Sequence, residues 1–440
     1  MSLKERLRTL PKYEVVGKVL AVVGPLIEAQ IPDVSIGDVC KIDNKIEAQV
    51  VGFKENKVLL MSFTDTTGVK VGSSVRTKGY LPYVKVGSDL IGKVIDPFGN
   101  PLNSEKLELF DRIDLYQEPV NPLERERINT PLDTGIRVIN GLFTLGIGQR
   151  IGIVAGAGVG KSTLLGMIAK YSTADLNIIA LIGERGREVR EFIEDSLGEE
   201  GLKKSVVIVA TSDQPPLTKI RAAHTANAIA TYFAKQNKKV NLLFDSLTRL
   251  AMAQREIGLT IGEPPTTKGY TPSVFSLLPK IIEIAGNFKK GSITGFYTVL
   301  VEGDDISADP VADSAISFLD GHIVLSRDIA DKRIYPAIDI LKSISRLTPQ
   351  LVSKEVIKYQ AIINETEAIY KEAEDMINLG LYKRGSNPKM DIALKYHEKI
   401  VSFIKQDLNE KVTLDESIKE LKDLAENIIQ EAEKYGIKWD

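Results

Sequence analysis

The chain is poor in the residues that mark secreted, membrane-spanning and metal-binding proteins. Its 440 residues include one cysteine, three histidines and one tryptophan. A single cysteine, Cys40, excludes an internal disulfide framework and suits a reducing compartment. No apolar run is long enough to cross a bilayer, and the first residues contain no apolar signal core. We therefore expect a soluble, cytoplasmic protein.

Excess charge of either sign is also missing. Lys and Arg number 57, and Asp and Glu number 59, which argues against a chain built mainly to hold nucleic acid. The scattered histidines, His224, His322 and His397, lack metal-ligand spacing, so we expect structural roles. We expect Cys40 to be a small core residue. The length is too great for one core and predicts two or three domains.

Three segments with different patterns divide the chain. Residues 13–63 contain short β-branched runs separated by turn residues, which predicts a small antiparallel barrel or sandwich. From about 136 to 350, strand-like and helix-like runs alternate, which predicts a mostly parallel sheet covered by helices. Helices are then predicted at 352–377, 389–406 and 413–435. The predicted domains are 1–85, with a short charged leading segment, 86–350 and 351–440.

The last predicted helix carries its own start signal. Thr413 and Glu416 have the spacing of a capping box. Apolar residues then recur along one face, at Leu414, Ile418, Leu421, Leu424 and Ile428. We expect an amphipathic helix that packs against its own domain.

The strongest motif joins a strand to a helix. The apolar run Ile151–Val154 predicts a buried strand, and a glycine-rich loop then ends in Lys161 and Ser162 at the start of a helix. This is the order of a phosphate-binding P-loop, in which glycines let backbone N–H groups face phosphate oxygens. Lys161 would reach the β- and γ-phosphates, and Ser162 would bind Mg²⁺. The predicted phosphate-binding residues are Gly156, Ala157, Gly158, Val159, Gly160, Lys161, Ser162 and Thr163.

One position departs from the P-loop consensus, because Ala155 stands where the pattern has its first glycine. The alternative is a glycine-rich turn that only caps a helix. Because strand, loop, Lys-Ser pair and helix all agree, the phosphate-binding interpretation is favoured.

Charged residues follow two further apolar runs. Asp245 ends the run Val240–Phe244, the Walker-B pattern of a Mg²⁺ site, although many such aspartates only cap helices. Glu184 follows the predicted strand 177–182 and can deprotonate an attacking water; the alternative is a solvated charged turn. Arg249, one helical turn after Asp245, can return towards the phosphates or form an ion pair.

Spacing alone does not decide the roles of two later residues, Tyr335 and Arg346. Tyr335, expected at a strand end, can stack on adenine, but a buried tyrosine is the commoner explanation. Arg346 is by default a surface or ion-pair residue.

These motifs resemble the type III protein-export ATPases, a family related to the rotary ATP synthase subunits, and above all its flagellum-specific branch. The resemblance is specific across about 90–350. Ala155 at the first position of the phosphate loop also matches the export ATPases, whereas the ATP synthase catalytic subunit has no alanine there. The matching stretches are Gly135–Leu142, Gly148–Ile153, Gly183–Phe192, Asp245–Gly258, Gly262–Pro279, Tyr297–Asp305 and Asp320–Arg327.

The resemblance implies roles for single residues. Glu184 would be the catalytic carboxylate, Arg346 an arginine finger donated to a neighbour's site, and Tyr335 the residue that stacks on adenine. The implied catalytic residues are Lys161, Glu184, Arg185, Arg249 and Arg346, and the implied metal ligands are Ser162 and Asp245. Tyr382 is a weaker match to the adenine pocket.

The resemblance also implies an architecture and partners. A RecA-like P-loop domain of the α/β class would lie between a small N-terminal β-barrel and a C-terminal helical domain. ATP and Mg²⁺ would be the cofactors, and the chain would form a homohexamer without nucleic acid. Its partners would be a stator-like negative regulator, a central stalk protein, an export gate and chaperone–substrate complexes. These would hold it peripherally at the cytoplasmic face of the export apparatus.

Three other functions stay open. An injectisome ATPase has nearly the same motifs. A non-catalytic subunit of a rotary ATPase keeps the fold but loses the catalytic carboxylate, so Glu184 with Lys161 argues against it. A hexameric RNA helicase of the transcription-terminator type needs an RNA-reading domain and a basic channel, which the balanced charge does not support.

Overall fold

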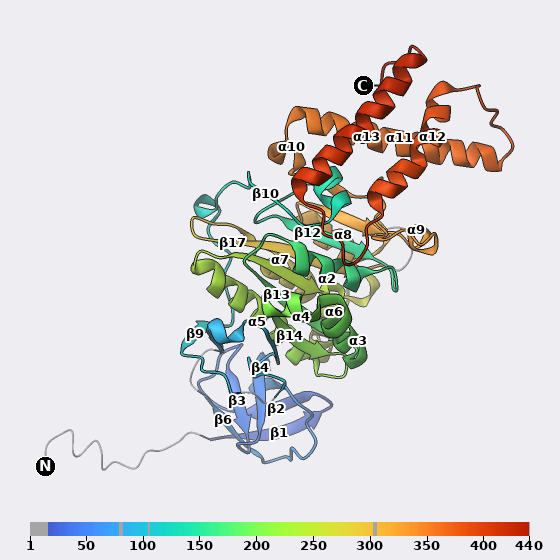
Figure 1. The fold of residues 1–440 in the computed structure, drawn as a ribbon. Helices are drawn as coiled ribbons and strands as arrows, with labels where there is room; N and C mark the ends of the chain where they lie inside the picture. The colour runs from blue at the N-terminus through green and yellow to red at the C-terminus, as the bar shows by residue number, and fades with distance from the viewer. Residues whose placement is uncertain (1–15, 79–81, 104–105, 302–305, 440) are drawn as a thin grey trace, which may run out of the picture.

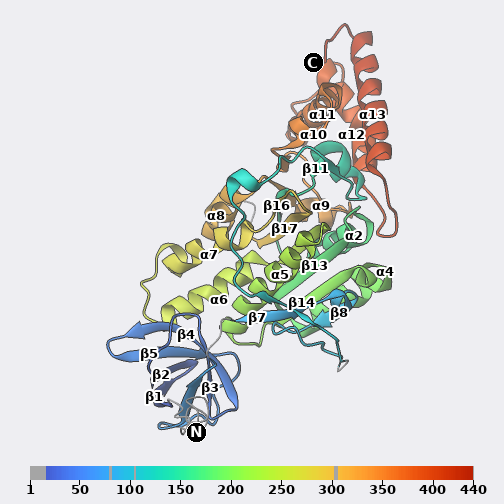
Figure 2. The same cartoon turned by 90° about the vertical axis from the view of Figure 1, so that its left-hand side faces the viewer.

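The computed structural model describes residues 16–78, 82–103, 106–301 and 306–439, arranged as three stacked parts (Figures 1 and 2). A β-barrel and a bundle of long helices lie at opposite ends, with a large sheet and its helices between them. The predicted three-part α/β architecture is confirmed. The charged leading segment lies outside the described residues, and the domain boundaries stay predictions.

The N-terminal part is a closed six-stranded barrel, so the barrel prediction is right and the sandwich alternative is wrong. Its strands pair in the order β1-β2-β5-β4-β3-β6. They are β1 (Gly17–Val23), β2 (Leu26–Gln30), β3 (Val39–Ile42), β4 (Ile46–Lys54), β5 (Lys57–Ser62) and β6 (Ser74–Thr77). Alternate residues such as Ile27, Cys40 and Leu60 point inward and are fully buried, which confirms the core role of Cys40.

The central part is a nine-stranded sheet in the order β19-β18-β12-β17-β15-β13-β14-β8, with β16 paired to β17 beside this path. Its parallel strands are β8 (Lys93–Ile95), β12 (Arg150–Ala155), β13 (Leu176–Glu184), β14 (Ser205–Thr211), β15 (Lys239–Asp245), β17 (Ser292–Leu300) and β18 (Gly321–Leu325). The two antiparallel members are β16 (Gly286–Asn287) and β19 (Ile344–Ser345). The predicted, mostly parallel sheet is confirmed.

Apolar side chains on both faces of the sheet form two cores. Ile179 and Leu243 face one core, whereas their neighbours Ile178 and Leu242 face the other. Burial on both faces explains why these strands are continuous apolar runs. The covering helices are α2 (Lys161–Tyr171), α3 (Gly186–Glu191), α4 (Gly198–Lys203), α5 (Pro216–Lys235), α6 (Leu247–Thr260), α7 (Pro272–Ile282), α8 (Pro310–Phe318) and α9 (Arg327–Asp331).

Short elements join the three parts. The pairs β7 (Tyr83–Val86) with β9 (Asp111–Asp114), and β10 (Pro131–Leu132) with β11 (Leu145–Gly146), form two-stranded sheets. A π-helical turn at Ile139–Phe143 lies between β10 and β11 in the chain, and it packs against the C-terminal helices.

The C-terminal part is helical, as predicted. It contains α10 (Thr348–Leu351), α11 (Lys354–Asn378), α12 (Pro388–Ile404) and α13 (Leu414–Lys434). The Thr413 side chain accepts the Glu416 N–H while Glu416 reaches back to the Thr413 N–H, so the predicted capping box is confirmed. In the part of the chain that the structure describes, we find no helix with the length and apolar character needed to traverse a membrane.

Candidate active site

The parallel sheet collects the predicted charged residues at one edge. β12, β13 and β15 all run the same way, so their carboxyl ends meet there. Glu184 and Asp245 are the last residues of β13 and β15, and Lys161 follows β12 across the loop. The Lys161 Nζ lies 2.5 Å from Asp245 Oδ1 and 3.3 Å from Glu184 Oε1. Three residues far apart in sequence thus form one buried cluster.

The loop between β12 and α2 has the backbone of a phosphate cradle. Gly158 and Gly160 adopt φ values of 78° and 92°, in the left-handed region that favours glycine. Gly160 is the residue before α2, so the free N–H groups of the first turn face the loop. Ala155 needs no such freedom, because it is the last residue of β12, buried and paired with Leu300 and Leu325. Its departure from the consensus therefore leaves the loop intact.

The two carboxylates keep Lys161 protonated despite its burial. Burial alone would lower the pKa of Lys161, but the Asp245 and Glu184 carboxylates outweigh it and raise that pKa above its usual value. Asp245 is 2% exposed, and its Oδ1 also accepts the Thr298 hydroxyl at 2.7 Å. The lysine is therefore a fixed cation, held where two strands end.

The Glu184 carboxyl has a raised pKa. Burial raises its pKa, and Asp245 and a hydrogen bond to Glu188 raise it further, while Lys161 opposes them. The same hydrogen bond lowers the pKa of Glu188. Glu184 is 8% exposed, so the alternative of a solvated charged turn is wrong for this residue. A buried carboxyl with a raised pKa is suited to accept a proton.

Arg185 lies apart from the cluster. Its side chain is 75% exposed and pairs with Glu188 at 2.8 Å. Its place beside the phosphates stays a prediction.

Arg249 supplies a second cation from α6. Ser246, whose Oγ accepts the Arg249 N–H, caps that helix, so Asp245 is no helix cap. The Nε of Arg249 is buried and has no hydrogen-bond partner among the described residues. The side chain packs on Gly183, where an added Cβ would fall 2.9 Å from the Arg249 Cβ. An unsatisfied buried donor fits an anionic ligand.

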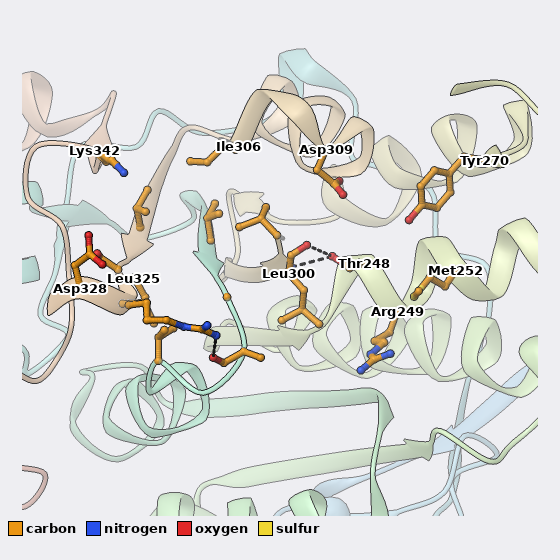
Figure 3. Close-up of a pocket in the computed structure, with 18 residues that line it drawn as sticks. Thr248, Arg249, Met252, Tyr270, Leu300, Ile306, Asp309, Leu325, Asp328 and Lys342 are labelled. Atoms are coloured by element: carbon orange, nitrogen blue, oxygen red, sulfur yellow. Dashed lines mark hydrogen bonds between the residues drawn. The ribbon is translucent and has the colours of Figure 1, made fainter. Parts of the chain in front are cut away.

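A cavity of about 620 Å³ opens on one side of the phosphate loop. Arg249 and Tyr270 lie at one end of this cavity and Lys342 and Asp328 at the other (Figure 3).

A second pocket, of about 540 Å³, lies on the Gly158 and Gly160 side of the loop. Tyr335 lines it, and an added Cβ on Gly160 would fall 3.6 Å from the Tyr335 ring. Lys405, Gln406, Asp407 and Leu408 form the facing wall. A planar base whose phosphates follow the loop would fit between them.

Three expectations for this pocket are corrected. Tyr335 is 40% exposed, so the buried-tyrosine alternative is wrong. It lies in a bend rather than at a strand end, because the next sheet contact is the isolated bridge from Leu325 to Ile338. Tyr382 does not line the pocket, and its hydroxyl donates to Asp391 at 2.7 Å.

Arg346 is not brought to this cluster. It follows β19, whose Ser345 pairs with Gly321 at the start of β18, and its Nη1 donates to the Leu319 carbonyl at 3.3 Å. The phosphate loop lies beyond the other end of β18, a strand length of about 13 Å away. Arg346 is exposed and bonds to a carbonyl, so its own site is served by other cations.

The histidines have the structural roles that we expected. Burial lowers the pKa of His224 to about 4, and its ring meets Tyr116 edge-on at 4.7 Å. His322 bonds to the Lys342 carbonyl and His397 to Glu367. Within the described ranges, no group of three or more His, Cys, Asp or Glu residues could hold a metal ion.

Sequence reasoning missed three residues around the site. Thr298 was detectable as a polar residue in the apolar strand β17, and Arg327 as a cation two residues after the end of β18. Gln406, which is 4% exposed and donates its N–H to the Tyr335 carbonyl at 2.9 Å, carried no signal in the sequence.

The residues present fit a nucleoside triphosphate with Mg²⁺. The loop N–H groups, Lys161 and Arg249 supply positive charge for phosphates. Ser162 and Asp245 supply the oxygen ligands that Mg²⁺ prefers.

Comparisons with known proteins agree with this geometry. The ATP synthase alpha/beta family model for the nucleotide-binding domain matches residues 135–345, and the one for its beta-barrel domain matches residues 19–79. The T3SS EscN ATPase C-terminal domain model matches residues 352–423. Central, barrel and helical parts each have a counterpart.

Curated relatives cover nearly the whole chain. The flagellum-specific ATP synthase of Aquifex aeolicus is 51% identical over 93% of this chain and 94% of its own length. The type 3 secretion system ATPase of Xanthomonas euvesicatoria is 44% identical over 92% of this chain and 93% of its own length.

A solved structure extends the likeness to three dimensions. The assembled ATPase EscN of the enteropathogenic E. coli type III secretion system has a TM-score of 0.88 and 43% identity, covering 93% of this chain and 100% of that chain. EscN in complex with its central stalk EscO gives a TM-score of 0.86. The chain therefore belongs to the type III export ATPases, P-loop enzymes that hydrolyse ATP and that include the flagellum-specific ATP synthases and type 3 secretion system ATPases.

Proposed function

We propose that this chain is the ATPase of a flagellar protein-export apparatus, where ATP hydrolysis energises the delivery and unfolding of export substrates. The supporting observation is that its identity to a flagellum-specific relative exceeds its identity to a type 3 secretion system ATPase. Both branches share the motifs of the active site, so the flagellar assignment belongs to this proposal.

At the site, the phosphate loop and Lys161 bind the β- and γ-phosphates, and Tyr335 stacks on the adenine. Ser162 and Asp245 hold Mg²⁺, which would neutralise phosphate charge when bound. Glu184 accepts the proton of the attacking water, because it is the buried carboxyl with the raised pKa beside Lys161. Arg249 and Arg185 stabilise phosphate charge.

We further propose that the working form is a homohexamer in which Arg346 enters the site of the neighbouring subunit. EscN has been solved as an assembled ATPase. In a ring, the exposed Arg346 at the amino end of β18 would act on the phosphates bound by the neighbouring subunit, and not on those bound by its own subunit.

We assign the protein partners by the same likeness. EscN has been solved with its central stalk EscO, so a stalk protein is proposed to meet this ring as well. A stator-like regulator, an export gate and chaperone–substrate complexes complete the proposed set, at the cytoplasmic face of the export apparatus.

A pull-down from cells that express the tagged chain tests the assignment. Recovery of flagellar stalk, regulator and gate proteins is the expected result. Recovery of injectisome components instead would move the chain to the virulence branch, and RNA with no export protein would overturn the export function. The Lys161→Ala variant is the control. Partners whose binding requires bound nucleotide should be lost from its pull-down, whereas partners that require only the folded chain should still be recovered.

A further inference from the structure

Arg327 reaches the phosphate loop from a neighbouring strand. The register between β12 and β18 pairs Ala155 with Leu325, so both strands end side by side. Arg327 begins α9 two residues later, and its Nη2 donates to the Ala157 carbonyl at 3.1 Å. A cation from a second strand is thus bonded to the backbone of the loop.

This hydrogen bond fixes the direction of the next backbone donor. The described chain has cis peptide bonds only at Asp245–Ser246 and Tyr335–Pro336, so the bond between Ala157 and Gly158 is trans. In a planar trans peptide the C=O and the N–H point in opposite directions. Because the Ala157 carbonyl faces Arg327, the Gly158 N–H faces away from it.

The two sides of the loop differ in what they hold. Ala157 and Arg327 line the cavity of about 620 Å³ that Figure 3 shows. Gly158 lines the other pocket, of about 540 Å³, together with Tyr335. The Gly158 N–H is therefore directed to the side of Tyr335, where the base and the phosphate next to it are proposed to lie.

We propose that Arg327 is a positioning residue for phosphate binding: it holds the Ala157 carbonyl outward and so presents the Gly158 N–H to a nucleotide phosphate. A cationic donor on the carbonyl also polarises the peptide and makes its N–H a stronger donor. The inference rests on the proposed nucleotide site and adds a residue to it from outside the P-loop motif.

The local structure offers no better reason for an arginine at this position. Arg327 is the first residue of α9, where the helix dipole disfavours a cation. The helix would be served better by an acidic or neutral residue. The bond to the loop therefore accounts for the arginine, and α9 does not.

Nucleotide affinity of Arg327→Ala tests the proposal. We expect a fluorescent ADP analogue to bind about tenfold more weakly and the KM for ATP to rise similarly, as loss of a charge-assisted hydrogen bond implies. The kcat should change less, because Arg327 touches no reacting atom. Arg327→Lys should recover part of the affinity. Lys332→Ala, which removes an exposed cation directly after α9, is the matched control and should bind as the wild type.

The possible outcomes separate this inference from the proposed site. If the wild type binds no nucleotide, the proposed site itself fails. If the wild type binds and Arg327→Ala binds equally well, the positioning role is overturned and the site stands. If Arg327→Ala lowers the unfolding temperature, Arg327→Lys decides: recovered affinity supports the role, and affinity as weak as that of the alanine variant at a normal unfolding temperature overturns it.

Discussion

At the scale of single residues, the site depends on one buried lysine between two carboxylates of unequal character. Asp245 lies closer to Lys161 and also accepts the Thr298 hydroxyl. Glu184 lies farther away, is bonded to another carboxyl and has a raised pKa. Two acids on neighbouring strands with different environments can take different roles. This difference supports the proposed roles, metal binding for Asp245 and proton acceptance for Glu184.

Glu184→Gln should separate binding from chemistry. The amide keeps the shape of the side chain but cannot accept the proton, so turnover should fall about 10²–10⁴-fold while nucleotide affinity stays near that of the wild type. Steady-state ATPase assays and fluorescent-nucleotide titrations measure the two effects. Unaltered turnover would place the base elsewhere, with Glu188 the next candidate.

The pH dependence of the wild type follows from the same carboxyl. A base works only when deprotonated, so the rate falls as pH falls through its pKa. Because the pKa of Glu184 is raised, the acidic limb of kcat/KM should lie above the ordinary glutamate value of about 4.3. The residual activity of Glu184→Gln should lack this limb.

Residue identities at the site were predictable where the backbone alone decides them. Asp245 and Glu184 are the last residues of their strands and the phosphate loop directly follows a strand, so strand order places them. Sequence spacing does not predict the direction of a side chain. The Tyr335 ring is partly exposed and lies beside Gly160, and the Arg185 side chain points to solvent. Gln406 could not be predicted from the sequence, because its hydrogen-bond partners Tyr335 and Gly135 lie far away in the chain.

At the scale of elements, long apolar runs were predictable and the short strands β6 and β19 were not. β13 and β15 are buried on both faces, and their composition shows it. β6 has four residues and β19 has two, and tertiary pairing creates them. Such strands contribute too few residues for a period to emerge.

The start of α13 makes a prediction at this scale. Thr413 accepts the N–H of Glu416, so Thr413→Ala should lower the free energy of unfolding by about 1 kcal/mol, and Thr413→Ser should change it little. Chemical denaturation with a helical signal measures this. An alanine variant as stable as the wild type would show that packing of the α13 face alone fixes the helix.

At the scale of the whole molecule, the central part contacts both of its neighbours through specific side chains. The Thr218 hydroxyl on α5 bonds to the Phe63 carbonyl of the barrel, and Arg221 lies over the Phe63 and Phe98 rings. At the other end, Gln406 joins the Tyr335 carbonyl to the helical part. The pocket wall is therefore built from two parts of the chain, which links nucleotide binding to the position of the helices.

The sheet also has two functional ends. Its carboxyl end holds Lys161, Glu184 and Asp245, whereas Arg346 lies at its amino end, about 13 Å away along β18. In a ring, the amino end of one subunit can face the carboxyl end of the next. The proposed finger then serves a neighbour's phosphates.

Arg346→Ala tests the ring. The variant should bind ATP yet turn it over slowly even when assembled, because arginine fingers contribute about 10³–10⁵ in rate. Wild-type activity per subunit should rise with protein concentration as rings form. Lys354→Ala, which removes another exposed cation a few residues later, is the control and should keep full activity.

Mixing defective subunits carries the argument one step further. Arg346→Ala and Lys161→Ala are each expected to be inactive alone, but a mixed ring contains interfaces that pair an intact loop with an intact arginine. Rings that tolerate an inactive neighbour would regain partial activity, whereas a strictly sequential ring would not. Full activity of Arg346→Ala alone, at concentrations where rings form, would remove Arg346 from the mechanism, because the only cation at the amino end proposed to act on a neighbour would then be dispensable.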